Sequence, residues 1–299
     1  MTTTPAAAAR EAGKPEALPR VGWIGLGNIG APMALRVAAA GFPLQAWARH
    51  PEQAAALAAA GATLATDPES LAQRCDLVAT IVGGPQDVSE LHRRMIPVAR
   101  RGTLFVDMTT AAAANADEAR VLAASVGANV LDAPVTGGVG GAQRGALTAF
   151  VGGDAGALER ARPLLAAFCA RVVHAGPPGA GYRMKLVNQT MIAGTLLGLA
   201  GGARLARACG FASPALKDAL SGGTAAGFLF DSYVARMIDG DGPVTFTLGM
   251  LRKDLRLARD EVAACGLDTG FHDAALAAVE AACVRHGERE GVQALAAAG

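Results

Sequence analysis

Short apolar runs alternate with longer helical patterns along the chain between Val21 and about His174. Six of these runs have the length of a β-strand: Val21–Ile24, Leu44–Trp47, Leu77–Ile81, Leu104–Asp107, Val130–Asp132 and Leu147–Val151. The segments between them are rich in alanine, leucine and arginine, as in Pro32–Ala40, Glu52–Ala60 and Ala114–Val126. Strands and helices in alternation predict a parallel sheet covered by helices.

The pattern changes after Gly179, where the strand-like runs stop. The helical patterns that follow are Gly181–Ala208, Ser213–Leu220, Gly227–Met237, Leu248–Cys265 and Phe271–Arg285. We therefore predict an α/β protein with an N-terminal parallel-sheet domain over residues 21–180. A long helix (181–208) joins it to an all-α C-terminal domain that covers 181–299. Residues 1–20 are rich in Ala, Pro and Thr and are expected to form a flexible leader.

The charge balance narrows the range of partners. The chain has 27 basic and 26 acidic side chains and a net charge of +1, which argues against binding to nucleic acid or to an anionic membrane surface. The longest apolar run, Met191–Ala203, is shorter than the roughly 20 residues of a membrane span and predicts a buried helix. We expect neither a nucleic acid nor a membrane as a partner.

The cysteines and histidines are scattered. None of the five cysteines belongs to a CxxC or Cys/His cluster, and this spacing is typical of buried free thiols in a reducing compartment. We therefore expect a cytoplasmic protein. The five histidines show no HxxxH or HExxH spacing, so no metal site is expected.

A glycine motif stands directly after the first predicted strand and opens the first helix. It reads Gly25-Leu26-Gly27-Asn28-Ile29-Gly30. In a GxGxxG loop the first glycine permits a tight turn, the second lets the backbone approach a pyrophosphate, and the third lets helix and strand pack closely. A chain with 38 glycines could contain the motif by chance, but the strand–turn–helix context favours a Rossmann-type dinucleotide-binding domain contacting the cofactor along Gly25–Gly30.

The end of the second strand bears on the choice between NAD and NADP. An NAD enzyme normally has an acidic residue there for the ribose 2′-hydroxyl, whereas this segment has Arg49 and His50 and no acid before Glu52. Arg49 could clamp a 2′-phosphate, or it could be a solvated arginine at a loop edge. We predict that NADP is preferred and that Arg49 and His50 contact the cofactor.

Two further motifs place polar groups where a small molecule could bind. Thr136-Gly137-Gly138 follows a strand, and such a loop can direct N–H groups towards an anion such as a substrate carboxylate. Lys185, Asn188 and Gln189 stand at i, i+3 and i+4, on one face of the long apolar helix. Polar groups there either pair structurally or line a site, and the residues alone leave both readings open.

Four blocks together resemble the β-hydroxyacid dehydrogenase family, which includes 3-hydroxyisobutyrate dehydrogenases and tartronate semialdehyde reductases. They are GLGNIGAPMA at 25–34, DAPVTGGVGGAQRGAL at 132–147, GAGYRMKLVNQ at 179–189 and FTLGMLRKDLRLA at 246–258. The resemblance extends from about Val21 to Glu280. It implies hydride transfer between a nicotinamide cofactor and a short carboxylate-bearing β-hydroxy acid or β-semialdehyde, of the 3-hydroxyisobutyrate or tartronate semialdehyde type.

On the substrate side, the resemblance implies that Lys185 is the general acid that protonates the carbonyl oxygen and the base in the reverse direction. Thr136, where the family usually has serine, would bind the substrate carboxylate together with Gly137 and Gly138. Asn188 and Gln189 would position the substrate oxygen and Lys185. Many relatives have asparagine at the position of Gln189. In having glutamine there, this chain resembles the tartronate semialdehyde and threonate branches of the family.

On the cofactor side, Thr110 matches a threonine that contacts the cofactor. Lys253 matches a lysine that closes over the cofactor from the second domain. Val82 and Gly83 stand in a loop where relatives often have Leu-Pro, and they are expected to touch the cofactor. Asp231 and Asp254 lie on helical patterns and are expected to be solvated or to cap helices.

Two other functions stay open at this point. Imine reductases share the expected architecture, although they usually have Asp or Tyr where Lys185 stands. A non-catalytic NADP-binding sensor would be expected to have lost the lysine. Phe228, Phe230, Asp231 and Tyr233 are candidates for shaping the substrate pocket.

The predicted helix 181–208 is apolar around much of its circumference, and one small helical domain does not easily cover all of it. We therefore predict a homodimer or homotetramer that forms through the helical domain, as the resemblance also implies.

Overall fold

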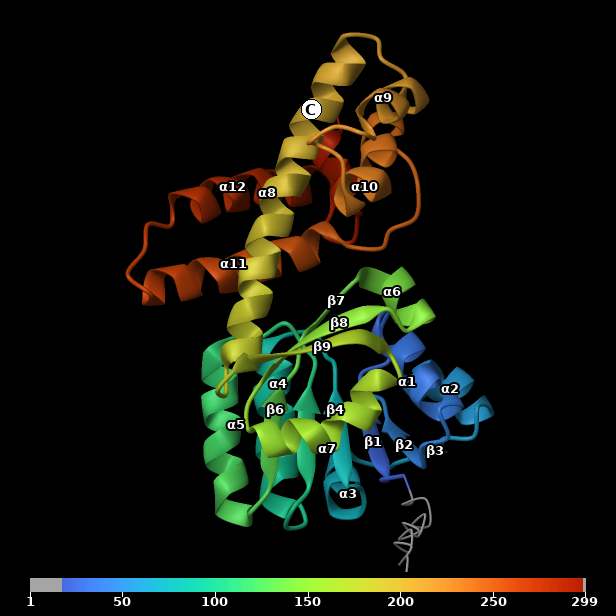
Figure 1. Ribbon diagram of the computed structural model, residues 1–299, viewed down its shortest axis with the longest axis vertical. Helices are drawn as coiled ribbons and strands as arrows, with labels where there is room; N and C mark the ends of the chain where they lie inside the picture. Colours follow the sequence, from blue (N-terminus) through green and yellow to red (C-terminus); the bar gives the residue numbers. More distant parts are fainter. Residues whose placement is uncertain (1–17, 298–299) are drawn as a thin grey trace, which may run out of the picture.

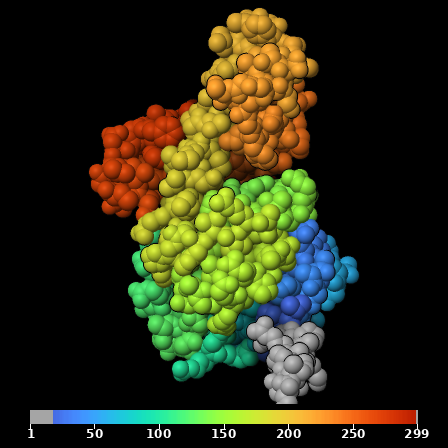
Figure 2. All heavy atoms as spheres, viewed as in Figure 1, coloured from blue at the N-terminus to red at the C-terminus, as the bar shows by residue number. Residues whose placement is uncertain are grey.

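The computed structural model describes residues 18–297, so most of the predicted leader at 1–20 lies outside the described residues. The chain forms a sheet domain, from which the long helix α8 rises to a helical part (Figure 1). In the space-filling view the helical part, yellow to red, stands on the sheet domain, blue to yellow-green (Figure 2). No helix among residues 18–297 is long and apolar enough to cross a membrane.

The strands are β1 Val21–Ile24, β2 Leu44–Trp47, β3 Thr63–Leu64, β4 Leu77–Thr80, β5 Leu104–Asp107, β6 Asn129–Asp132, β7 Val135–Thr136, β8 Leu147–Gly152 and β9 Cys169–Gly176. The α-helices are α1 Gly30–Ala39, α2 Ala55–Ala59, α3 Pro68–Arg74, α4 Pro85–Met95, α5 Ala113–Val126, α6 Gly138–Arg144, α7 Ala155–Ala166, α8 Ala180–Ala208, α9 Ser213–Leu220, α10 Phe228–Asp239, α11 Leu248–Ala264 and α12 Gly270–His286. Three 3₁₀ helices, η1 Pro51–Ala54, η2 Ile96–Val98 and η3 Val292–Ala296, complete the elements.

The sheet has the order β3-β2-β1-β4-β5-β6-β8-β7, with β9 paired to β8. Its first six strands are parallel, and their order is that of the dinucleotide-binding Rossmann fold. The predicted fold class is confirmed, although the sheet is mixed because β8 runs antiparallel to β6 and β7. In such a sheet the ligand binds beyond the carboxyl ends of the strands where the order reverses, here between β1 and β4.

All six predicted strands are present, and β3, β7 and β9 are additional. The interior strands β1, β4 and β5 are buried along their whole length, because helices cover both faces of the sheet. This burial explains why they stand out as continuous apolar runs. β3 and β7 have two residues each, and most of β9 is exposed or half-buried, so the apolar pattern gives them no clear signal.

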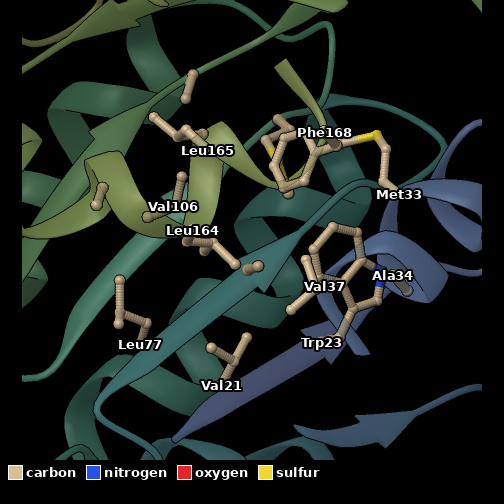
Figure 3. Packing of buried hydrophobic residues seen from close by; sticks show 14 of the residues in the cluster. Val21, Trp23, Met33, Ala34, Val37, Leu77, Val106, Leu164, Leu165 and Phe168 are labelled. Atoms are coloured by element: carbon tan, nitrogen blue, oxygen red, sulfur yellow. The ribbon is translucent and has the colours of Figure 1, made fainter. Parts of the chain in front are cut away.

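One face of the sheet packs on α1 and α7 around Trp23. The rings of Trp23 and Phe168 meet edge to face with centroids 5.9 Å apart (Figure 3). Met33 and Val37 of α1 and Leu164 of α7 belong to the same buried cluster. The indole Nε1–H of Trp23 donates to the carbonyl oxygen of Gly25 at 3.0 Å, so this core extends to the glycine-rich loop.

The helical part has a core of its own between α8, α10, α11, α12 and η3. The five predicted helices of this part are confirmed, with ends that differ by no more than two residues. Phe230 and Tyr233, two of the candidate pocket residues, are buried in this core, whereas Phe228 and Asp231 are exposed. The division of the chain at residues 180/181 stays a prediction.

The expectation that all five cysteines are buried is wrong. Cys75, Cys169 and Cys283 are buried, but Cys209 and Cys265 are exposed, and all five are free thiols. Cys209 and Cys265 each follow directly on the last residue of a helix, α8 and α11, and an apolar residue at a helix end is not necessarily turned into the core.

Candidate active site

The glycine-rich loop connects β1 to α1, and its geometry requires glycine at positions 25 and 30. Gly25 has a φ of +102°, and a Cβ there would collide with the carbonyl oxygen of Ile81 at the end of β4. A Cβ on Gly30 would collide with the carbonyl oxygen of Gly25. The two glycines therefore let β1, β4 and the start of α1 approach closely.

The same loop leaves room for a ligand at Gly27. A Cβ built on Gly27 would meet no atom within 4 Å. Within residues 18–297, the backbone N–H groups of Asn28, Ile29 and Gly30 at the start of α1 donate to no protein acceptor. Free N–H groups at a helix N-terminus, beside open space, fit the pyrophosphate of a dinucleotide.

Arg49 and His50 stand two and three residues after the end of β2 and are largely exposed. The guanidinium of Arg49 forms an ion pair with the carboxylate of Asp87, with Nη2 and Oδ1 3.2 Å apart. His50 Nδ1 lies 3.8 Å from a carboxylate oxygen of Glu52. Asp87 lies in the first turn of α4, and the sequence reasoning missed it because it considered only the acids that follow β2.

The loops after β4 and β5 meet under Lys253. The N–H of Val82 donates to Oγ1 of Thr109 at 3.0 Å. The ammonium of Lys253, on α11, donates to the carbonyl oxygen of Thr110 at 3.2 Å, and its Cδ would lie 3.4 Å from a Cβ on Gly84. The structure thus brings Lys253 together with the two loops that contain Val82, Gly83 and Thr110.

Buried Asp107 holds these loops against the long helix α8. Its carboxylate accepts hydrogen bonds from the hydroxyl of Thr80, from the N–H and hydroxyl of Thr109, and from the hydroxyl of Tyr182 at 2.8 Å. Asp107 and Tyr182 are both almost fully buried. Sequence reasoning did not single out either residue, although an aspartate that ends an apolar strand is a signal for a buried acceptor.

A second buried carboxylate, Asp132 at the end of β6, fixes the start of α8. It accepts the N–H groups of Gly179 at 2.8 Å and Tyr182 at 3.0 Å. A Cβ on Gly181 would collide with the carbonyl oxygens of Asp132 and Phe150, so this turn lies directly on the sheet. Burial raises the pKa of the Asp132 carboxyl.

Lys185 lies one turn further along α8 and is 7% exposed. Its ammonium forms no ion pair or hydrogen bond with any residue in the described part of the chain. Burial lowers the pKa of Lys185 from 10.5 to about 8, Asp254 opposes this change, and the nearby cation of Lys253 adds to it. Near neutral pH this amine can therefore both donate and accept a proton.

A series of hydrogen bonds links the polar residues around Lys185. The side-chain amide of Asn188 donates to the hydroxyl of Thr136 at 3.4 Å and to Oε1 of Gln189 at 3.0 Å. Nε2 of Gln189 donates to Oδ2 of Asp254 at 2.5 Å, and the other oxygen of Asp254 lies 2.8 Å from the ammonium of Lys253. This series brings the candidate substrate residues and Lys253 to one place.

The expectation for Asp254 is wrong. Its side chain is buried and paired with Gln189 and Lys253 instead of being solvated or capping a helix, because α11 packs against α8 at this level. Asp231 is exposed, as expected. Periodicity placed Asp254 on a helix, but it did not show which neighbouring helix that position would face.

The remaining candidate residues stand at the start of α6, with Gly137 directly before the helix and Gly138 as its first residue. Gly137 and Gly138 have φ values of +127° and +65°, which strain any residue other than glycine. A Cβ on Gly138 would meet no atom within 4 Å, whereas one on Gly137 would lie 3.0 Å from Cδ2 of Leu147. Gly138 therefore borders open space, two residues from the Thr136 hydroxyl that receives the bond from Asn188.

Two family models match this chain and together cover almost all the described residues. The NAD binding domain of 6-phosphogluconate dehydrogenase matches residues 20–176. The NAD-binding domain of NADP-dependent 3-hydroxyisobutyrate dehydrogenase matches residues 179–298. The two matches meet at the start of α8, between the sheet and the helical part.

Curated relatives cover most of the chain. A probable 3-hydroxyisobutyrate dehydrogenase of Mycobacterium tuberculosis is 34% identical over 256 residues, which span 82% of this chain and 86% of the relative. An NAD-dependent L-serine dehydrogenase of Pseudomonas aeruginosa is 33% identical over 267 residues, 86% of this chain and 90% of the relative.

Solved structures have the same fold. The structure of Mycobacterium tuberculosis 3-hydroxyisobutyrate dehydrogenase with L-serine superposes with a TM-score of 0.84 at 29% identity, over 93% of this chain and 98% of that one. An imine reductase from Pseudomonas sp. superposes with a TM-score of 0.63 at 19% identity, over 93% of this chain and 98% of that one, and this shows a shared fold alone.

Proposed function

The chain belongs to the β-hydroxyacid dehydrogenase family, and from this premise we propose that it interconverts a short β-hydroxy acid and the matching β-semialdehyde with Lys185 as general acid and base. The protein is an NAD(P)-dependent oxidoreductase that transfers hydride on a β-hydroxy acid. Beyond this reaction class, we propose the type of substrate, the roles of the residues and the preference for NADP.

The relatives support a small substrate with a carboxylate. One is named for 3-hydroxyisobutyrate and another for L-serine, and both compounds have a carboxylate and a hydroxyl on the third carbon. We assign the carboxylate to the loop of Thr136, Gly137 and Gly138, where Gly138 borders open space. The substrate is then of the 3-hydroxyisobutyrate or tartronate semialdehyde type.

The chain's own residues supply proton transfer and alignment. The bound nicotinamide cofactor supplies the hydride, or accepts it in the oxidative direction. Nζ of Lys185 gives a proton to the substrate carbonyl oxygen during reduction and takes the hydroxyl proton during oxidation. Asn188 and Gln189 orient the substrate oxygen, and Asp254 fixes the amide of Gln189 through their 2.5 Å hydrogen bond.

The observation that carries the proposal is the ammonium of the buried Lys185 side chain, which has no hydrogen-bond or ion-pair partner within residues 18–297 although Asp254 and Lys253 are close enough to affect its pKa. A buried charge without a partner is costly and is typical of a functional site. The test is oxidation of NADPH and NADH with tartronate, methylmalonate and succinic semialdehydes and glyoxylate, beside a Lys185→Ala variant.

We expect turnover with one of these compounds, and a loss in kcat of about 100-fold or more in Lys185→Ala. The dissociation constant for NADPH should change by less than about threefold, because Lys185 is assigned to the substrate. NADPH binding without turnover of any β-oxo acid would contradict the proposal and favour a sensor. Turnover of imines alone would favour an imine reductase, whose fold this chain shares.

The pKa of Lys185 gives the proposal a pH signature. Reduction needs the ammonium, so its kcat should fall as pH rises through about 8. Oxidation needs the neutral amine, so its kcat should rise through the same range. Initial rates with saturating substrate from pH 6 to pH 10 test this, and an oxidative profile that stays flat between pH 7 and pH 10 would exclude Lys185 as the base.

We propose that the cofactor lies on Gly25, Gly27, Asn28, Ile29 and Gly30. Residues of four further segments would complete its site: Arg49, His50, Val82, Gly83, Thr110 and Lys253. The open space at Gly27 and the free N–H groups at α1 support the pyrophosphate position. Arg49 supports a preference for NADP, because it follows the second strand, where this fold binds the ribose 2′ position, and its guanidinium is exposed. Equilibrium titration with NADPH and NADH measures the preference.

We also propose a homodimer or homotetramer formed through the helical part. One face of α8 exposes uncharged residues along its length: Met191 and Leu205 are about two-thirds exposed, Val187 is 51% exposed and Met184 is 41% exposed. Such a stripe is typical of an interface. Light scattering at micromolar concentration should give twice or four times the 30.0 kDa of one chain, and a single-chain mass would contradict the proposal. A cytoplasmic location stays a prediction.

A further inference from the structure

Arg49 and Asp87 form an ion pair at the edge of the candidate cofactor site. Arg49 follows β2, and Asp87 lies in the first turn of α4, which follows the cofactor loop after β4. Nη2 of Arg49 lies 3.2 Å from Oδ1 of Asp87, and no other residue in the range 18–297 bonds to either side chain. The other oxygen of Asp87 lies 2.6 Å from a Cβ built on Gly83, so the carboxylate lies against that loop.

The pair stands where this fold distinguishes the two cofactors. The ribose 2′ position lies beyond the end of β2, where an acid accepts the hydroxyl of NAD or an arginine binds the phosphate of NADP. β2 itself ends without an acid, and the first acid after it is Glu52. Since Asp87 is bonded to Arg49, the tertiary structure places a carboxylate within reach of the same ribose position from another element.

We propose that Asp87 is a specificity-determining residue that restrains the preference for NADP and allows NAD to bind. A 2′-phosphate must draw Arg49 away from Asp87, and it then lies close to the negative charge of the same carboxylate. A 2′-hydroxyl meets no such opposition and can donate to Asp87. This assignment rests on the proposed role of Arg49 at the 2′-phosphate.

The test measures equilibrium binding of NADPH and NADH without substrate, by the fluorescence of the bound reduced nicotinamide. In Asp87→Asn we expect the dissociation constant for NADPH to fall by about threefold to tenfold, while that for NADH stays equal or rises. The effect should shrink in about 0.5 M salt, because both side chains are partly exposed and salt screens their charges. Circular dichroism should be unchanged, since neither side chain is buried.

Two further variants separate this effect from a general change of charge. Glu90→Gln removes an exposed acid on the same helix, α4, and should leave the NADPH/NADH ratio within about twofold of the wild type. In an Arg49→Ala background, Asp87→Asn should change the logarithm of the NADPH dissociation constant by at most half as much as it does in the wild type. The reason is that no guanidinium remains to be released from Asp87.

The outcomes distinguish this inference from the proposed NADP preference. A wild type that binds NADH more tightly than NADPH would overturn the preference but not the role of Asp87, provided that Asp87→Asn still shifts the ratio towards NADPH. An unchanged ratio in Asp87→Asn, or an equal shift in Glu90→Gln, would overturn the role of Asp87 whichever cofactor the wild type prefers.

Discussion

Replacement of Lys185 by methionine should stabilise the protein while it removes the activity. The Lys185 side chain is 7% exposed, and burial lowers its pKa from 10.5 to about 8. At about 1.4 kcal/mol for each pKa unit, keeping this ammonium charged in the folded state costs about 3 kcal/mol. Methionine has a similar unbranched chain without the charge, so we expect the free energy of unfolding at pH 7 to rise by about 1–3 kcal/mol.

The sign of this effect sets its pH dependence. The folded-state pKa of Lys185 lies below the unfolded value, so the folded wild type binds fewer protons between about pH 8 and pH 10.5. The buried ammonium therefore lowers the free energy of unfolding by its full amount below about pH 8, and this loss disappears as pH rises towards 10.5. The advantage of Lys185→Met should shrink through the same window.

Urea unfolding followed by far-ultraviolet circular dichroism, at about pH 7, pH 9 and pH 10.5, measures the difference. Lys217→Met is the matched control, because the Lys217 ammonium is exposed on α9 and donates only to the carbonyl oxygen of Asp231. Its free energy of unfolding should change by less than about 0.5 kcal/mol. A Lys185→Met variant no more stable than the wild type at pH 7, or one with the same advantage at every pH, would show that burial of the Lys185 ammonium does not destabilise the fold.

Three other predictions test the supports of the site. Tyr182→Phe deprives buried Asp107 of one of its donors and should lower the free energy of unfolding by about 1–3 kcal/mol in urea titrations. Gly25→Ala should abolish NADPH binding by forcing the loop apart, whereas Gly27→Ala should keep the native circular dichroism and only weaken NADPH binding. Burial lowers the pKa of His92, whose ring nitrogens have no partner in the described chain. The free energy of unfolding of the wild type should therefore fall as pH drops below about 6.5, because the unfolded state binds the proton more readily. His92→Leu should reduce that fall, measured between pH 8 and pH 5.

The fold class and most of the elements were predictable from the amino-acid sequence. The interior strands are buried on both faces, and the helices of the second part have continuous helical patterns, so each is visible within a window of a few residues. The glycine-rich loop was equally predictable. A Cβ on Gly25 would collide with the backbone of Ile81 after β4, and a Cβ on Gly30 would collide with the backbone of Gly25, so both positions require glycine. The candidate roles of Lys185 and Thr136 came from the family resemblance.

Which side chains contact one another depends on the tertiary fold. Arg49 and Asp87 are 38 residues apart, Gln189 and Asp254 are 65 apart, and Asp107 and Tyr182 are 75 apart. No local pattern encodes these pairs, because they depend on the order of strands in the sheet and on the packing of α11 against α8. The same packing removes Lys185 from water and lowers its pKa, since desolvation is a property of the whole surrounding structure and not of the residue.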